Sequence, residues 1–390
     1  MTVRETDKKY VANTYNRFDP VLVRGSGALA YDEDGKEYID MGSGIGVNAF
    51  GYSDPVWAGA VASQAAKLSH TSNLYYTEPC ALLAKMLCER TGMDKVFFSN
   101  SGAEANECAI KVARKYAADN YGPDRNVIVT LNNSFHGRTL TTLSATGQEH
   151  YHELFRPLTP GFEYIDVPDG GRLEELLKTG KVAALMIECI QGEGGVLPLD
   201  PDWARSAEAL VRKYGALLIV DEVQTGNGRT GALYAYMNLG LNPDVISTAK
   251  GLGGGLPIGA AIMSEKVSSV LGFGDHGSTF GGNPISCAGA LTVLSRIDEK
   301  LLSEVREKGE WLKNYFGQLP GVKSVSGTGL MIGILTERPA GEVVKECITR
   351  GVLCLTAKNR VRLLPPLNIP FDLLKKAASI IADCIQGTSE

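Results

Sequence analysis

Short apolar runs and longer stretches with helical periodicity alternate through the middle of the chain. Most of the apolar runs are hydrophobic on both faces, as expected for strands of a parallel sheet that helices cover on both sides. The clearest helical stretches are 78–92 and 101–120. The strands predicted from this pattern are 95–100, 126–131, 182–188, 216–223 and 244–249. The alternation predicts an α/β fold with a mostly parallel sheet.

The two ends of the chain carry different patterns. Residues 28–41 alternate between apolar and polar positions about Asp34-Gly35, a dipeptide typical of a tight hairpin turn. After about residue 284, amphipathic helices such as 301–319 alternate with short strands. The predicted domains are a large one over 46–284 and a smaller α+β domain formed by 1–45 and 285–390.

Composition narrows the class of protein. The chain has 390 residues and a net charge of −5, without the basic excess that marks nucleic-acid binders. No apolar run is long enough to cross a membrane, and the N-terminus lacks the apolar stretch of a signal peptide. The eight cysteines show no C-x-x-C spacing, which favours reduced thiols. We expect a cytoplasmic protein without a metal site and without nucleic-acid or membrane partners.

The stretch DVISTAKGLGGGLPIG (244–259) places Lys250 at the end of an apolar strand, before a run of glycines. A P-loop needs its glycines before the lysine, and the dinucleotide pattern G-x-G-x-x-G fails at Leu256 and Ile258. A lysine at a buried strand end is partly desolvated, which lowers its pKa and makes its amine a nucleophile for carbonyl groups. The glycines predict either room for a ligand or tight packing of the loop.

Other polar groups also follow predicted strands, where ligands bind in open α/β sheets. Ser101 predicts a helix cap, and the small residues Gly102 and Ala103 leave the first N–H groups of that helix open to an anion. The alternative is a capped helix that binds nothing. Phe135 could stack on a flat ring, and Arg138 presents a fork suited to a carboxylate or is a surface arginine.

Asp221 follows five consecutive apolar residues, where a carboxylate needs a partner. It could cap the next segment, hold a metal or pair with a protonated ring nitrogen. Together with Lys250 and an anion site at 101–103, it matches what pyridoxal phosphate (PLP) requires. Lys250 would bond to the aldehyde, and Asp221 would keep the pyridine nitrogen protonated. Phe135 and Val223 would cover the two faces of the ring.

The order of several motifs resembles the class III pyridoxal-phosphate aminotransferases of fold type I. These motifs are SGAEANE, FHGRT, QGEGGV, DEVQTGNGRTG, TAKGLGGGLPIGA, GSTFGGNP and RLLPPL. The resemblance covers nearly the whole chain and implies a mostly parallel seven-stranded sheet in the large domain. FHGRT, the HTSN segment and the compact length are most similar to the acetylornithine subgroup of arginine biosynthesis. One departure is Cys189, where many relatives have proline.

The resemblance also implies roles for matching residues. Lys250 and Asp221 would be catalytic, and Gln224 would lie near the ring hydroxyl. The implied cofactor-binding residues are Ser101, Gly102, Ala103, Phe135, Asp221, Glu222, Val223, Gln224, Lys250 and Thr279. The implied substrate-binding residues are Arg138, Ser278, Glu193 and Arg362. Ser278 and Thr279 would reach into the partner subunit's site, so the resemblance implies a homodimer with shared active sites.

The implied reaction moves the terminal amino group of N2-acetyl-L-ornithine to 2-oxoglutarate, giving N-acetylglutamate 5-semialdehyde and L-glutamate. Glu193 and Arg362 would switch the site between the two substrates. Three alternatives stay open: the same chemistry on succinylornithine, ornithine or 4-aminobutyrate, an aminomutase on the same fold, and a ligand-binding protein without activity.

Overall fold

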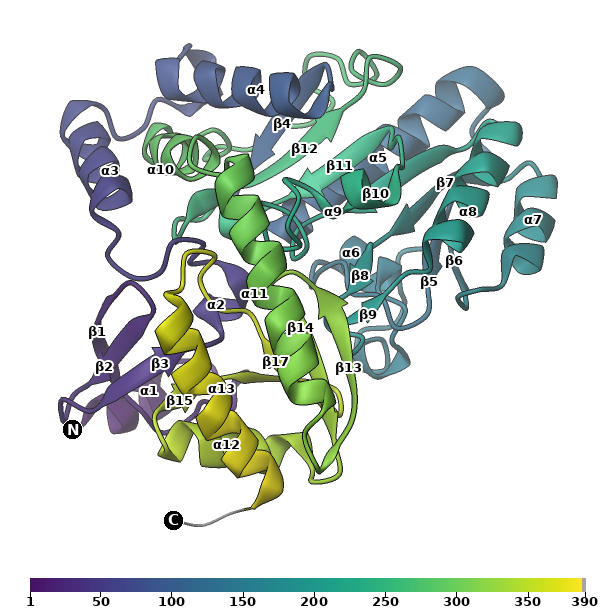
Figure 1. The fold of residues 1–390 in the computed structure, drawn as a ribbon. Coiled ribbons are helices and arrows are strands. Elements are labelled where there is room, and N and C mark those ends of the chain that lie inside the picture. Colours follow the sequence, from purple (N-terminus) through teal and green to yellow (C-terminus); the bar gives the residue numbers. More distant parts are fainter. Residues whose placement is uncertain (388–390) are drawn as a thin grey trace.

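The computed structural model describes residues 1–387, and its largest sheet has seven strands in the order β4-β12-β11-β10-β7-β5-β6 (Figure 1). The pairs are parallel except at β12, which runs antiparallel to β4 and β11. This confirms the predicted α/β class and the mostly parallel seven-stranded sheet. The strands are β4 (Lys95–Ser99), β5 (Val127–Leu131), β6 (Phe162–Ile165), β7 (Val182–Ile187), β10 (Leu217–Asp221), β11 (Val245–Thr248) and β12 (Gly259–Met263).

Both faces of this sheet are buried. Along β10, successive side chains point alternately into the hydrophobic cores on the two faces. Leu217 and Ile219 pack with the buried side of α5, whereas Leu218 and Val220 join the core on the opposite face. The helices α7 and α8 contribute to that opposite core. The helices on the two faces are α5 (Gly102–Tyr121), α7 (Gly170–Lys178) and α8 (Pro201–Lys213).

A four-stranded sheet joins the two ends of the chain. The predicted hairpin is present as β2 (Leu29–Asp32) and β3 (Glu37–Asp40), with Asp34 and Gly35 in the loop between them. On its other edge β3 pairs in parallel with β15 (Val352–Leu353), and β1 (Leu22–Ser26) completes the sheet. The N-terminal strands therefore lie beside the C-terminal helices in Figure 1. The exact domain limits stay a prediction.

A second four-stranded sheet follows residue 320 and is antiparallel throughout. Its strands are β13 (Val322–Thr328), β14 (Met331–Thr336), β16 (Leu355–Ala357) and β17 (Arg360–Leu363). The helices α11 (Glu299–Gly317) and α12 (Ala340–Thr349) pack against this sheet, and α13 (Phe371–Gln386) packs against both helices. The amphipathic helix predicted over 301–319 corresponds to α11.

The remaining elements are helices, short strands and 3₁₀ turns that connect or flank these sheets. They are α1 (Val3–Tyr10), α2 (Ser43–Gly46), α3 (Pro55–Lys67), α4 (Glu78–Thr91), α6 (Leu140–Ala145), α9 (Ala235–Leu239), α10 (Pro284–Leu294), β8 (Ile190–Gln191), β9 (Leu197–Pro198) and the 3₁₀ turns η1 (Ser72–Leu74), η2 (Glu149–Tyr151) and η3 (Lys250–Gly253). Among the helices of residues 1–387, none has the length and apolar character that a membrane crossing requires.

Candidate active site

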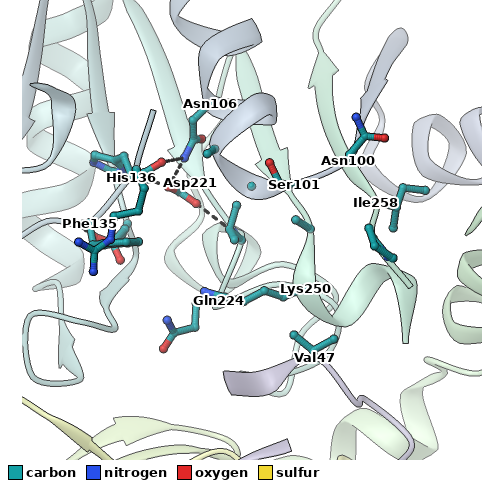
Figure 2. A pocket seen from close by; sticks show the side chains of 18 of the residues that line it. Val47, Asn100, Ser101, Asn106, Phe135, His136, Asp221, Gln224, Lys250 and Ile258 are labelled. Carbon is teal, nitrogen blue, oxygen red and sulfur yellow. Dashed lines mark hydrogen bonds and ion pairs between the residues drawn. The ribbon is translucent and has the colours of Figure 1, made fainter. Parts of the chain in front are cut away.

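The carboxyl ends of the central strands meet at a cavity of about 430 Å³. Figure 2 shows Asn106, His136 and Asp221 on one side of this cavity and Asn100 and Ile258 on the other, with Lys250 between them. The predicted site residues that line it are Ser101, Gly102, Ala103, Phe135, Arg138, Asp221, Val223, Gln224 and Lys250. Residues more than 140 positions apart in the sequence are thus brought to one place by the order of the strands.

Lys250 is the first residue of η3, directly after β11. Burial lowers the pKa of its ammonium group, although the charges of Glu193 and Asp221 oppose that shift. The strand end beneath it is fixed because Asn227 Nδ2 donates to Thr248 Oγ1 at 3.0 Å and to the Ala249 carbonyl at 3.2 Å. The sequence-based expectation of a desolvated lysine with a lowered pKa agrees with this environment.

Asp221, at the end of β10, is 4% exposed and accepts three hydrogen bonds. Asn106 Nδ2 and His136 Nδ1 donate to Oδ2 at 2.7 and 2.8 Å, and the Val223 N–H donates to Oδ1 at 3.0 Å (Figure 2). Donors of this kind stabilise the charged form of a buried carboxylate. Asp221 is therefore a buried carboxylate with a hydrogen-bond donor at each oxygen.

His136 and Asn106 are buried polar residues that were not among the predicted site residues. Burial lowers the pKa of the His136 imidazole, but the hydrogen bond and negative charge of Asp221 outweigh it and the net pKa is raised. Asn106 also fixes the loop of His136, since its Nδ2 donates to the His136 carbonyl at 2.7 Å. A signal was present in the sequence, because both residues lie inside the SGAEANE and FHGRT motifs.

Glu188 is a second buried carboxylate on the cavity wall that the predicted site did not include. It follows β7 and accepts from the Phe135 N–H at 2.9 Å and the Gly192 N–H at 3.3 Å. Burial raises its pKa to about 7. Glu188 therefore ties the loop that carries Phe135 to the loop that carries Glu193.

The first turn of α5 forms another wall of the cavity. Ser101 caps this helix by accepting from the Glu104 N–H at 3.2 Å. The N–H groups of Gly102 and Ala103 belong to the turn in which a helix offers no carbonyl partner, which makes it suitable for an anion. Gly102 also allows close approach, because a β-carbon there would lie 2.6 Å from Val223 Cγ1.

Glu193, Arg362 and Gln224 form a closed hydrogen-bonded triangle beside the cavity. Arg362 Nη1 donates to Glu193 Oε1 at 2.5 Å and to Gln224 Oε1 at 3.1 Å, and Gln224 Nε2 donates to Glu193 Oε1 at 3.2 Å. Burial raises the pKa of Glu193, but the adjacent Arg362 outweighs it and the net pKa is lowered. Gln224 lines the cavity, whereas Glu193 and Arg362 lie behind it.

Arg138 extends into the cavity without an ionic partner. Its guanidinium carbon lies 4.2 Å from the ring centre of Tyr151 and 5.5 Å from that of Phe135. Within residues 1–387 it has no hydrogen bond or ion pair. An arginine in this state is free to bind a carboxylate with its planar fork.

Besides Glu193 and Arg362, three predicted residues do not line the cavity of their own chain. Glu222 is turned away, accepting from Thr225 Oγ1 at 2.5 Å and the Tyr236 N–H at 2.7 Å. Ser278 lies at the edge, where its hydroxyl accepts from Asn100 Nδ2 at 3.1 Å. Thr279 is exposed to solvent. The roles expected of these residues stay predictions.

Comparison with known proteins places these features in a family. The family model of class-III aminotransferases matches residues 10–385. An acetylornithine aminotransferase from Haemophilus ducreyi is 49% identical over 98% of both chains. A succinylornithine transaminase from Yersinia pseudotuberculosis is 43% identical, covering 97% of this chain and 95% of the relative.

Solved structures agree with this match. Two structures of ornithine aminotransferase from Toxoplasma gondii superpose with TM-scores of 0.94 and 0.93 at 35% identity. Each comparison covers 98% of this chain and 94% of the other. One of the two describes PLP with partial occupancy at the active site of that protein.

Proposed function

Since the chain belongs to the class-III aminotransferases, we propose that it moves the terminal amino group of N2-acetyl-L-ornithine to 2-oxoglutarate. The products are N-acetylglutamate 5-semialdehyde and L-glutamate. The observation that carries this proposal is the cavity itself, in which Lys250, Asp221 and the first turn of α5 face one another. Identity is higher to the acetylornithine relative, at 49%, than to the succinylornithine relative, at 43%.

PLP is the cofactor that these residues fit. Bound PLP supplies an aldehyde for the substrate's amino group and a ring that accepts electrons from the reacting carbon. Lys250 is the amine suited to the aldehyde, Asp221 is the carboxylate suited to a protonated ring nitrogen, and the N–H groups of Gly102 and Ala103 suit a phosphate. Phe135 and Val223 lie on the cavity wall, where they would enclose the ring.

Lys250 is also the residue proposed to move the proton between the substrate carbon and the cofactor. Its lowered pKa increases the fraction of free amine near neutral pH, and only the free amine accepts a proton. General acid–base help of this kind contributes roughly 10²–10⁴-fold in rate.

The two substrates present their carboxylates differently, and we assign a different carboxylate to each of the two arginines. Arg138 would bind the carboxylate distant from the reacting amine, which both substrates have. Arg362 would be needed for the α-carboxylate of glutamate. In the other half-reaction Glu193 neutralises Arg362 and spares the protein an unpaired buried charge.

We infer further that the active unit is a homodimer in which Ser278 and Thr279 complete the partner's site. The segment around them is exposed yet held in place, since Asn73 Nδ2 donates to the Ser278 carbonyl at 2.8 Å and the Gly281 carbonyl at 2.9 Å. Large apolar side chains close to it are exposed in the single chain, namely Leu74, Tyr75, Tyr76, Phe273 and Phe280. Exposed patches of this kind mark protein–protein contacts.

The eight free cysteines support a reducing cytoplasm as the location.

A chemical map tests the cofactor proposal. Borohydride reduction of the purified protein, followed by digestion, is expected to leave a pyridoxyl group on Lys250. An adduct on another lysine, or none, would show that the assignment is wrong. A panel of acetylornithine, succinylornithine, ornithine and 4-aminobutyrate with 2-oxoglutarate as acceptor then tests the donor. Isomerisation without consumption of 2-oxoglutarate would favour an aminomutase instead.

A further inference from the structure

Tyr151 is a residue outside the cavity lining that makes contact with two residues inside it. It ends η2, in the connection between α6 and β6. Its ring lies 4.2 Å below the guanidinium carbon of Arg138 and meets the Phe135 ring edge to face, at 5.8 Å between centres and an interplanar angle of 70°. The three side chains therefore form one cluster, in which the Arg138 guanidinium lies over both rings.

The way in which Arg138 is held distinguishes it from Arg362, which lies behind the cavity. Arg362 is neutralised by Glu193, so a substrate carboxylate must compete with that partner. The contacts of Arg138 within the described chain are with ring faces. An aromatic face attracts a cation without neutralising it, because the ring contributes a quadrupole and no net charge. A carboxylate that reaches Arg138 therefore displaces no ion pair.

Tyr151 is itself fixed by the turn that carries it. The buried His152 donates from Nε2 to the Leu143 carbonyl at 2.9 Å, which ties the turn to α6. The Glu149 carboxylate contacts both His152 and Arg156. Its Oε2 lies 3.3 Å from His152 Nδ1, and its Oε1 forms an ion pair with Arg156. These contacts fix the turn from which Tyr151 projects, and the His150 ring lies 3.9 Å from the Tyr151 ring between centres.

We infer that Tyr151 is a positioning residue that holds the Arg138 guanidinium ready for a substrate carboxylate. The inference rests on the proposed function for the identity of the substrates. The contribution of Tyr151 is an attraction between its ring face and a cation. Both acetylornithine and 2-oxoglutarate carry the carboxylate that Arg138 would bind, so Tyr151 acts in both half-reactions.

Steady-state kinetics of Tyr151→Leu and Tyr151→Phe holoenzymes test this inference. Tyr151→Leu is expected to raise KM for both substrates roughly three- to tenfold, with kcat changed less than twofold, whereas Tyr151→Phe keeps the ring and stays near wild type. Replacing Tyr151 by pentafluorophenylalanine keeps the shape but reverses the quadrupole, so it is expected to behave like Tyr151→Leu. That third variant decides the matter if the leucine variant folds poorly.

Two controls separate positioning from a general structural effect. Arg125 stacks on Tyr121 at 4.0 Å, far from the cavity, so Tyr121→Leu removes a similar contact and is expected to leave KM unchanged. In an Arg138→Leu background, Tyr151→Leu is expected to have no further effect on KM, because its target is gone. An unchanged KM in Tyr151→Leu, or additive effects of the two substitutions, would overturn the inference.

Binding of glutarate measured by calorimetry gives a readout that does not require turnover. Glutarate carries the two carboxylates of 2-oxoglutarate without its keto group, so it reports on Arg138 even if the transferred amine is not that of acetylornithine. The expected result is the same ranking of variants in Kd as in KM. Equal Kd values for wild type and Tyr151→Leu would refute the role of Tyr151 while leaving the proposed reaction untouched.

Discussion

Lys250 holds a backbone φ of +44°, in the left-handed region that a β-carbon disfavours. Strain of this kind is often found at functional sites, where the surrounding structure compensates for it. In this protein the compensation includes the loop that follows, since Trp57 Nε1 donates to the Gly253 carbonyl at 2.9 Å. A β-carbon on Gly254 would lie 2.9 Å from that same Trp57 atom. Of the two predicted reasons for the glycines, tight packing thus has direct support at Gly254.

The raised pKa of His136 makes stability depend on pH with a definite sign. A group whose pKa is higher in the folded state stabilises fully below its unfolded value, about 6.5, and loses that contribution as pH rises through the folded value. The neighbours Asp221 and Glu188 are the charged groups that face it. We expect the difference in free energy of unfolding between wild type and His136→Gln to shrink as the pH rises above about 6.5.

Urea unfolding of the cofactor-free proteins at several pH values measures this difference. The NMR titration of the His136 ring is an independent check and is expected to show a midpoint above that of a model imidazole. A difference in the free energy of unfolding that grows with pH would contradict the expected sign.

Glu193→Ala removes the partner of Arg362 and leaves a buried cation in need of a carboxylate. We expect the ratio of the glutamate to the acetylornithine half-reaction to rise by roughly tenfold or more. Glu193→Gln keeps the size and hydrogen bonds but removes the charge. We therefore expect it to raise the same ratio, but by less than Glu193→Ala does. Single-turnover rates of the two half-reactions provide the measurement, and an unchanged ratio would contradict the switch.

At the scale of elements, the start of α5 depends on the absence of one side chain. A β-carbon on Gly102 would lie 2.6 Å from Val223, whose branched side chain cannot bend away. Gly102→Ala is therefore expected to cost about 1–3 kcal/mol and to weaken PLP retention. Gly59→Ala is the matched control in α3, because a β-carbon there meets nothing within 4 Å. Gly59→Ala is expected to stabilise the protein by about 0.5–1 kcal/mol. Urea unfolding of both variants and of the wild type measures these differences.

The elements that the sequence predicted share a clear local signal. The five predicted strands and the helix over 101–120 match the structure to within one or two residues at most ends, because long apolar runs and caps such as Ser101 determine them locally. β12 was not predicted, since its segment GAAIM has small residues and directly follows the glycine run. β6 was missed as well.

The candidate site was predictable where a residue follows a strand, as Lys250 and Asp221 do. The contacts that hold Asp221 in place were not predictable. His136 and Asn106 lie 85 and 115 positions from Asp221, and the pairing arises from strand order rather than from any local pattern. The same holds for the stack of Tyr151 on Arg138, which depends on the path of the chain between α6 and β6.

At the scale of the whole molecule, shared active sites predict complementation between inactive chains. Lys250→Ala lacks the lysine but keeps a normal 278–279 segment, and Thr279→Asp keeps the lysine but disturbs the segment. Mixed and reassociated in equal amounts, they form dimers in which one site is intact. We expect recovery of about a quarter of wild-type activity from two nearly inactive proteins, because half of the dimers are mixed.

Sedimentation of each variant is the control, since both must be dimers before mixing. No recovery on reassociation would show that each chain builds its site alone. Activity that needs no second chain would equally contradict the dimer that we propose.

The parallel pairing of β3 with β15 also has a consequence for the order of synthesis. During synthesis β3 emerges from the ribosome long before β15. The edge of β3 that pairs with β15 therefore stays unpaired while the seven-stranded sheet is completed. At that moment the nascent chain already holds Lys250 and Asp221, but residues 352–363 are still missing, and with them both the partner of β3 and Arg362. Residues 352–363 therefore complete the sheet of the N-terminal strands and supply Arg362 together, long after Lys250 and Asp221 have been synthesised.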